Sequence, residues 1–309
     1  MYSLKNKAAF VIATRNRPDD LSRTLESLAQ QSYKPDYLVI VDASEPPVEH
    51  IVKKFYDRLS IQYLYHLPPS AAQQRNIGAE AIESIGTDIT LVGFLDDDIE
   101  FKPDSLEKMM LFWDTASEDV GGSAFNLLNP PTQQLPCLKS NPLVSWLGLY
   151  SKEKGIVMPS GFHTLTGTVT KNLFVQWLPT TAILWRKYIL EKLTFDNYFT
   201  GYSYLEDLDF SYAASKNARL AIVSDAGYFH YPSTKSRISG YEFGKLELKN
   251  RVYFVRKHHL SLPKCYLGLS IRTMLSFLKI LGIKNLAYNL GRFFGNCVEM
   301  MWLLARKRG

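Results

Sequence analysis

The first half of the chain alternates short apolar runs with amphipathic segments, and no other feature constrains the fold as strongly. Leu21, Leu25 and Leu28 have the spacing of one helix face, and similar segments separate the later apolar runs. The runs that we expect to be strands span residues 8–13, 37–41, 61–65 and 90–95. Strands joined through helices lie parallel in one sheet. The sequence therefore predicts an α/β fold with a mostly parallel central sheet flanked by helices.

The composition is that of a folded globular protein. Of the 309 residues, 46% are hydrophobic and 21% are charged, which excludes a disordered, collagen-like or coiled-coil chain. Residues 129–167 are rich in Pro, Gly, Ser and Asn and have little periodicity. We expect an irregular excursion over the surface there.

The net charge of +6 is distributed unevenly along the chain. Residues 231–309 hold 15 Lys and Arg against 3 Asp and Glu, so residues 1–230 hold the other 21 against 27. A tail with a charge of +12 is expected to meet an anionic partner, either lipid headgroups or nucleic acid. We predict a first domain at 1–238 and a basic helical extension at 239–309.

Residues 267–283 favour lipid over nucleic acid as the partner of the tail. In a helix, Arg272, Thr273, Ser276 and Lys279 gather on one side and leave an apolar side opposite. Such a helix, surrounded by Lys and Arg, is expected to lie flat on an anionic membrane surface. A helix packed in a core or in an oligomer interface has the same pattern, so these alternatives stay open.

The cysteines and the N-terminus indicate the compartment. Cys137, Cys265 and Cys297 are odd in number and lack metal-ligand spacing, which favours a reducing environment. The apolar run at 8–13 is too short for a signal peptide, and we expect no membrane-spanning helix. We expect a cytoplasmic protein, peripheral on the inner face of the cell membrane.

Two acidic clusters could carry chemistry. Asp96, Asp97 and Asp98 follow a buried strand, where ligands of open α/β sheets bind, and their mutual repulsion is relieved by a divalent cation held with a phosphate. A solvated acidic turn before the next helix is the alternative. Glu206, Asp207 and Asp209 stand at a helix start; the helix dipole accounts for one or two acids there, and a general base would account for the rest.

Other polar residues could converge on the same sheet edge. Thr14, Arg15, Asn16 and Arg17 follow the first strand and Asp42 ends the second, whereas Arg75 lies in a helix. The arginines suit phosphate or a base edge, although a surface arginine is usually only solvated. His230 ends a strand-like run among aromatic residues, where a packed structural role is the alternative to a ligand.

Taken together, the motifs resemble the inverting glycosyltransferase family 2, which has the GT-A fold. The run Arg256-Lys257-His258 resembles its bacterial rhamnosyl- and polysaccharide-assembling members. The resemblance covers residues 8–230. It rests on Ala13-Thr14-Arg15-Asn16-Arg17-Pro18, Val41-Asp42-Ala43-Ser44, Arg75-Asn76-Ile77-Gly78, Leu95-Asp96-Asp97-Asp98, Phe195-Asp196 and Glu206-Asp207-Leu208-Asp209-Phe210.

The resemblance implies roles for individual residues. Asp207 would be the catalytic base, with Glu206 orienting the base or the acceptor. Thr180 and Thr181 would join Glu206 in contacting the sugar or acceptor. The metal, Mn²⁺ or Mg²⁺, would be held by Asp98, Asp96 and His230. The residues implied to bind the nucleotide are Thr14, Arg15, Asn16, Arg17, Asp42, Arg75, Asp96 and Asp97.

The function implied is metal-dependent, inverting transfer of a hexose from a UDP- or dTDP-linked sugar. The acceptor would be a hydroxyl of a saccharide or lipid-linked saccharide. The product would belong to the synthesis of O-antigen or capsule type polysaccharide. Residues 13–16 contain no glycine, which argues against a sugar nucleotidyltransferase and against a dehydrogenase. A non-catalytic nucleotide-sugar-binding or scaffold protein with the same fold is the remaining alternative. The tail could also form an oligomer interface, and we expect no nucleic-acid partner.

Overall fold

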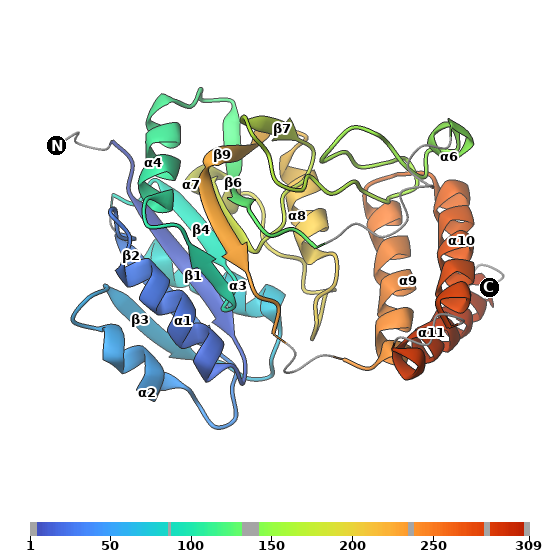
Figure 1. Ribbon diagram of the computed structural model, residues 1–309, viewed down its shortest axis with the longest axis horizontal. Coiled ribbons are helices and arrows are strands. Elements are labelled where there is room, and N and C mark those ends of the chain that lie inside the picture. Colours follow the sequence, from blue (N-terminus) through green and yellow to red (C-terminus); the bar gives the residue numbers. More distant parts are fainter. Residues whose placement is uncertain (1–4, 86–87, 132–141, 234–237, 281–284, 306–309) are drawn as a thin grey trace. The chain divides into compact units, whose positions relative to one another are not determined.

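The computed structural model describes residues 5–85, 88–131, 142–233, 238–280 and 285–305, and its contacts divide the chain into two compact units (Figure 1). The sheet unit comprises residues 1–132 and 166–236. The helical unit comprises residues 133–165 and 237–309. The segment at 133–165 thus belongs with the C-terminal helices, a pairing that the sequence gave no reason to expect.

A nine-stranded sheet forms the centre of the sheet unit, and its path runs β3-β2-β1-β4-β8-β6-β9-β5, with β7 paired to β9. β3, β2, β1 and β4 run parallel, as predicted, whereas β8 is antiparallel to both of its neighbours. The strands are β1 (Ala8–Thr14), β2 (Tyr37–Asp42), β3 (Ile61–Tyr65), β4 (Leu91–Leu95), β5 (Ile99–Phe101), β6 (Val120–Leu127), β7 (Leu173–Val175), β8 (Ala182–Arg186) and β9 (Arg219–His230).

Helices cover both faces of this sheet, because the central strands β1 and β4 are apolar on both sides. One core contains leucines of α1 and methionines of α4; the other contains residues of α3 and α8. The helices of the unit are α1 (Pro18–Ala29), α2 (Glu49–Val52), the 3₁₀ turn η1 (Lys53–Phe55), α3 (Ala71–Ser84), α4 (Ser105–Thr115), α7 (Lys187–Leu190) and α8 (Glu206–Ala214). The prediction of an α/β fold with a sheet flanked by helices is confirmed.

A glycine fixes the distance between α3 and the sheet. A Cβ atom on Gly78 would lie 2.2 Å from Cγ1 of Val11 in β1, closer than any side chain could tolerate. The helix therefore packs directly on the strand. This close packing sets the position of Arg75, which lies one turn earlier on α3.

The helical unit contains α6 (Pro142–Trp146), α9 (Gly240–Lys257), α10 (Leu262–Ile280) and α11 (Leu286–Ala305). Ser239 and Glu242 form a capping box that starts α9. The loop that follows α6 is hydrogen-bonded to the connection between α9 and α10, because the N–H of Ser261 donates to the carbonyl of Pro159 at 2.8 Å. The side chain of Lys279 lies outside the described parts. So do Cys137, residues 234–237 and residues 306–308.

No helix in the described ranges is both long enough and apolar enough to cross a membrane.

Candidate active site

Three neighbouring strands end at one edge of the sheet and carry polar side chains there. β1 ends at Thr14, which pairs with Asp42 at the end of β2 in the parallel register. On the other side of β1, β4 ends at Leu95 opposite Ile12, and the three aspartates follow. The parallel register therefore brings Thr14 level with the aspartate turn, as the sequence led us to expect.

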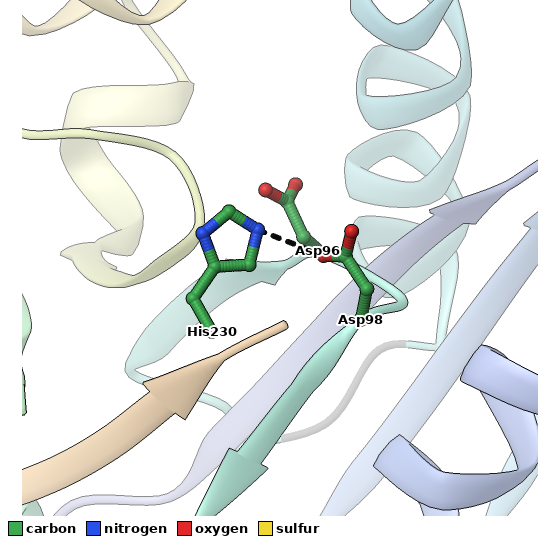
Figure 2. A group of neighbouring side chains, drawn as sticks. All are labelled: Asp96, Asp98 and His230. Atoms are coloured by element: carbon green, nitrogen blue, oxygen red, sulfur yellow. Dashed lines mark ion pairs between the residues drawn. The ribbon is translucent and has the colours of Figure 1, made fainter. Parts of the chain in front are cut away.

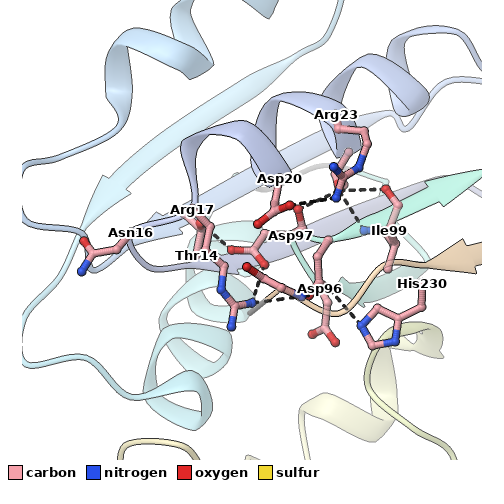
Figure 3. A network of polar contacts seen from close by, with 12 residues as sticks. Thr14, Asn16, Arg17, Asp20, Arg23, Asp96, Asp97, Ile99 and His230 are labelled. Carbon is pink, nitrogen blue, oxygen red and sulfur yellow. Dashed lines mark hydrogen bonds and ion pairs between the residues drawn. The ribbon is translucent and has the colours of Figure 1, made fainter. Parts of the chain in front are cut away.

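Asp97 anchors this edge from within (Figure 3). Its two carboxylate oxygens are engaged by the hydroxyl of Thr14 at 2.7 Å and by the guanidinium of Arg17 at 3.0 Å. The hydroxyl of Thr24 on α1 bonds the carbonyl of Asp97 at 2.9 Å. Burial raises the pKa of Asp97 to about 7 against the opposing effect of Arg17. The structure places Asp97 and Thr14 inside the protein, where they hold the turn.

Asp96, Asp98 and His230 lie together at the same edge, and Figure 2 shows their side chains converging. One ligand atom of each lies within 4.8 Å of the others, the one such group among the described residues. His230 arrives there because β9 runs antiparallel to β5 and places it opposite Ile99. These are the three residues expected to hold the metal.

The chemistry of this group fits a divalent cation. Nε2 of His230 lies 3.0 Å from Asp98, whose other oxygen accepts the N–H of Ser233 at 3.0 Å. Burial alone would raise the pKa of Asp98, but these two donors outweigh that effect, so the pKa is lowered. Burial alone would lower the pKa of His230, but Asp98 outweighs that effect, so the pKa is raised. Two carboxylates and one imidazole form a donor set that Mn²⁺ accepts readily and that offers Mg²⁺ its oxygen ligands.

Arg75 joins the two acidic clusters. Its guanidinium lies 3.1 Å from Asp96 and also pairs with Glu206 at the start of α8. The arginine is buried (7% exposed), and the ring of Phe195 lies 5.6 Å from its guanidinium carbon. These two ion pairs are important because a buried charge without a counter-charge lowers the stability of the fold. The sequence predicted Arg75 near the diphosphate but did not predict its link to Glu206.

The first turn of α8 separates the predicted catalytic residues. Glu206 is buried and bound to Arg75, whereas Asp207 is half-buried and bonds the N–H of Leu208 at 2.7 Å. Ser203 and Leu205 precede them with φ angles of 51° and 75°. Left-handed backbone at a leucine is strained, and such strain clusters at functional sites.

The loops after β1 and β2 are bonded to each other. The N–H of Asn16 donates to the hydroxyl of Ser44 at 2.7 Å, and the Asn16 side chain accepts the N–H of Glu45 at 2.9 Å. Asp42 is fully buried and accepts the N–H groups of Ser44 and Val48. Asn16 and Asp42 thus shape the loops expected at the nucleotide. Arg15 is exposed.

Thr180 and Thr181, which the sequence suggested for the sugar, lie just before β8. Thr180 is buried, and the carbonyl of Thr181 accepts the N–H of Asp96 at 2.9 Å. This bond brings the threonines beside the proposed metal ligands, because β8 pairs with β4.

Two neighbours of Arg75, which the sequence placed in the same run but without a role of their own, support the site. Gln74 bonds the carbonyls of Thr14 and Val41 at 3.1 and 2.7 Å and so ties the ends of β1 and β2 together. Asn76 exchanges two hydrogen bonds with the backbone of Phe195, at 2.8 and 2.9 Å. Both flank Arg75 within one polar run of α3, which is the only signal that the sequence offered.

Residues 9–134 match the family model described as Glycosyl transferase family 2. A search of curated protein sequences gave no match.

Solved structures share the fold. S. aureus TarS 1–349 in complex with UDP-GlcNAc is 18% identical with a TM-score of 0.53, over 97% of this chain and 92% of that one. GalNAc-T7 with UDP, GalNAc and Mn²⁺ is 16% identical (TM-score 0.59, 82% and 48%). Mannosyltransferase PcManGT from Pyrobaculum calidifontis with GDP-Man and Mn²⁺ is 12% identical (TM-score 0.55, 96% and 87%). The chain spans 43% of the longer TarS structure. At these identities the likeness establishes the fold.

Proposed function

Because the chain is a glycosyltransferase of the GT-A fold whose residues 9–134 belong to family 2, we propose that it transfers a hexose from a UDP- or dTDP-linked sugar to a hydroxyl of a saccharide acceptor. The observation that carries the proposal is the continuous chain of side chains from His230 through Asp98, Asp96 and Arg75 to the start of α8. It connects a cation site with a site for a base. Complexes of structural neighbours with UDP-GlcNAc and GDP-Man support a nucleotide-sugar donor.

On the donor side, Asp96, Asp98 and His230 would hold Mn²⁺ or Mg²⁺. When bound, the cation stabilises the negative charge that grows on the leaving diphosphate. Arg75 is held by Asp96 and Glu206, so its position is fixed before the donor arrives, and its guanidinium suits a diphosphate oxygen. Arg15 and Arg17 supply further positive charge beside the nucleotide.

On the acceptor side, Asp207 takes the proton from the attacking hydroxyl. Glu206 is neutralised by Arg75 and positions the turn, which leaves the more accessible Asp207 as the base. Thr180 and Thr181 lie where they can contact the sugar. Attack from the side opposite the leaving diphosphate inverts the anomeric centre.

The acceptor is a lipid-linked saccharide in this proposal, as in the assembly of a cell-surface polysaccharide of the O-antigen or capsule type. The chain then works in the cytoplasm at the inner face of the membrane. The excess of 15 Lys and Arg over 3 Asp and Glu in residues 231–309 supports such a location, because anionic lipid attracts basic segments.

The test is release of nucleoside diphosphate from a panel of UDP-, dTDP- and GDP-sugars with Mn²⁺, with Mg²⁺ and with chelator. We expect release from one UDP- or dTDP-sugar, abolished by the chelator, and a product of inverted configuration by NMR. A protein that binds nucleotide but releases none from any donor and acceptor pair would contradict the proposal.

A further inference from the structure

Two helices of the helical unit, α10 and α11, bury polar groups and expose many of their large apolar ones. On α11, Gly295, Asn296 and Glu299 are buried against α9. The opposite side of the same helix is apolar and open to solvent, at Leu286, Leu290, Phe294, Met301 and Leu304, and Val298 and Trp302 are exposed at its border with α9. A helix on the surface of a soluble domain has the reverse pattern.

α10 repeats this arrangement. Two residues of the polar strip predicted from the sequence face the packed side of the helix, since Ser276 is buried and Arg272 pairs with Glu247 of α9. Its apolar side is exposed at Leu267, Met274, Phe277 and Leu278. A helix packed in a core would bury this side instead, so the structure decides against that alternative.

Glycines and an ion-pair cluster help to hold the unit together, beside buried apolar residues such as Leu248, Phe254 and Leu269. Glycines recur four residues apart on both packed helices, at Gly240 and Gly244 and at Gly291 and Gly295. A Cβ on Gly244 would lie 2.3 Å from the carbonyl oxygen of Arg292, so the helices touch backbone to backbone. Such packing through small residues is typical of helices surrounded by lipid.

The exposed apolar residues of the two helices form one surface, which we call the outer face. Phe277 of α10 lies 5.2 Å from Phe293 of α11 between ring centroids, and Phe293 lies 5.6 Å from Phe294. Phe294 and Met301 are 53% and 64% exposed. Large contiguous apolar surfaces mark sites that meet a membrane or another protein.

Basic side chains border the outer face. Lys245 and Lys249 of α9 line a groove with Val298 and Trp302 of α11. Glu242 and Glu299 also line it, but Glu242 is bonded in the capping box of α9 and Glu299 is buried. A tryptophan next to lysines at the edge of an apolar surface is the arrangement found where proteins meet lipid headgroups.

We propose that the outer face of the helical unit binds the surface of an anionic lipid bilayer, with Phe294 and Met301 in the apolar boundary and Lys245 and Lys249 at the phosphate level. Both kinds of residue are needed, because apolar area and attraction to anionic lipid together set the strength of interfacial binding. Residues 237–309 carry 14 Lys and Arg against 3 Asp and Glu, which gives the required charge. This inference does not rest on the proposed transfer reaction.

Sedimentation of the full chain with vesicles tests it. We expect binding to vesicles of phosphatidylcholine and phosphatidylserine, and at least a tenfold loss in the variant Phe294→Asp with Met301→Asp. Leu111→Asp is the matched control, since Leu111 is a 44% exposed apolar residue on α4 of the sheet unit, and it should bind as the native chain does. Replacing Lys245 and Lys249 by Gln should weaken binding about fivefold for each lysine, as expected for about 1 kcal/mol each.

Three outcomes would overturn the proposal. They are a native chain that ignores anionic vesicles at low salt, a double Asp variant that binds undiminished, and equal binding to vesicles of phosphatidylcholine alone. The chain could instead form a dimer in the absence of lipid, and the double Asp variant could be a monomer. In that case the outer face binds a second copy of the chain and not a membrane. Circular dichroism spectra and nucleotide binding like those of the native chain show that the variants are folded. They also distinguish a failure of the membrane proposal from a failure of the proposed transfer reaction.

Discussion

Arg75 is the residue on which the two acidic clusters depend. It is buried, and it reaches Asp96 on the strand side and Glu206 on the helix side. Neither carboxylate is free to take its own position, because each shares the same guanidinium. The division of labour between Glu206 and Asp207 follows from this geometry and leads to the prediction for Asp207 below.

Replacing Asp98 by Ala should abolish the enhancement of nucleotide affinity by metal. The carboxylate lies against His230 in the proposed cation site, so its loss removes one ligand. Calorimetric titration of UDP with and without Mn²⁺ measures the enhancement. Asp98→Asn repeats the test with the shape preserved, and Asp104→Ala, an exposed acid paired with Lys108, is the control. Unchanged enhancement in both Asp98 variants would move the metal elsewhere.

Replacing Asp207 by Asn should lower kcat by roughly two to four orders of magnitude and leave donor affinity nearly intact, as expected for the loss of a general base. Glu206→Gln should behave differently, because it releases Arg75 and so weakens donor binding. Steady-state kinetics and calorimetry separate the two effects. If Asp207→Asn keeps most of its turnover, Asp207 is not the base.

At the scale of elements, the three long C-terminal helices are joined by Glu247. This glutamate of α9 is buried and pairs with Arg272 of α10 and with Arg292 of α11, the latter at 2.8 Å. Burial would raise the pKa of Glu247, but the two arginines lower it below its ordinary value. One buried side chain therefore links three helices.

Replacing Glu247 by Gln should destabilise the helical unit by about 3 kcal/mol, since it leaves two guanidinium groups without a counter-charge. Urea unfolding followed by circular dichroism measures the difference. Glu191→Gln, at an exposed position after α7, should change little. A Glu247 variant as stable as the native chain would mean that the helices do not need the cluster.

The same residue predicts a pH dependence. Because the pKa of Glu247 is lower in the folded state, its stabilisation is fully present above the unfolded value of about 4.3 and is lost as the pH falls toward the folded pKa. The native chain and Glu247→Gln should therefore converge in stability below about pH 4. A difference that stays constant from pH 7 to pH 3 would contradict a charge effect.

For the whole molecule, a ligand that binds only the folded state must raise its stability. UDP or dTDP with Mn²⁺ at 100 times its Kd should stabilise the sheet unit by about 2.7 kcal/mol, or roughly 5–10 °C in Tm. Differential scanning fluorimetry of the native chain measures this shift. The nucleotide without metal should give a smaller shift, and Asp98→Asn should show no difference between the two conditions. Equal shifts with and without metal would exclude the cation from donor binding.

The sequence by itself determined the four parallel strands and the strand-end positions of Thr14, Asp42 and Asp96 to Asp98. This was possible because hydrophobic periodicity and turn residues are local properties. It did not predict β5 or β6. β6 contains two glycines and an asparagine and lacks alternation, and β5 has three residues. Neither is recognisable without the neighbours that bury it.

The tertiary structure alone decided which polar groups face each other. His230 and Asp98 are 132 residues apart and meet because β9 pairs with β5, and Arg75 meets Glu206 because Gly78 lets α3 pack on β1. It also decided which side of α10 faces out. The sequence divided that helix correctly into a polar and an apolar side, but a periodic pattern is the same whichever side is buried. In the folded chain the carboxylate of Glu247 pairs with Arg272 from the polar side, and Leu269 and Ser276 are buried on that same side.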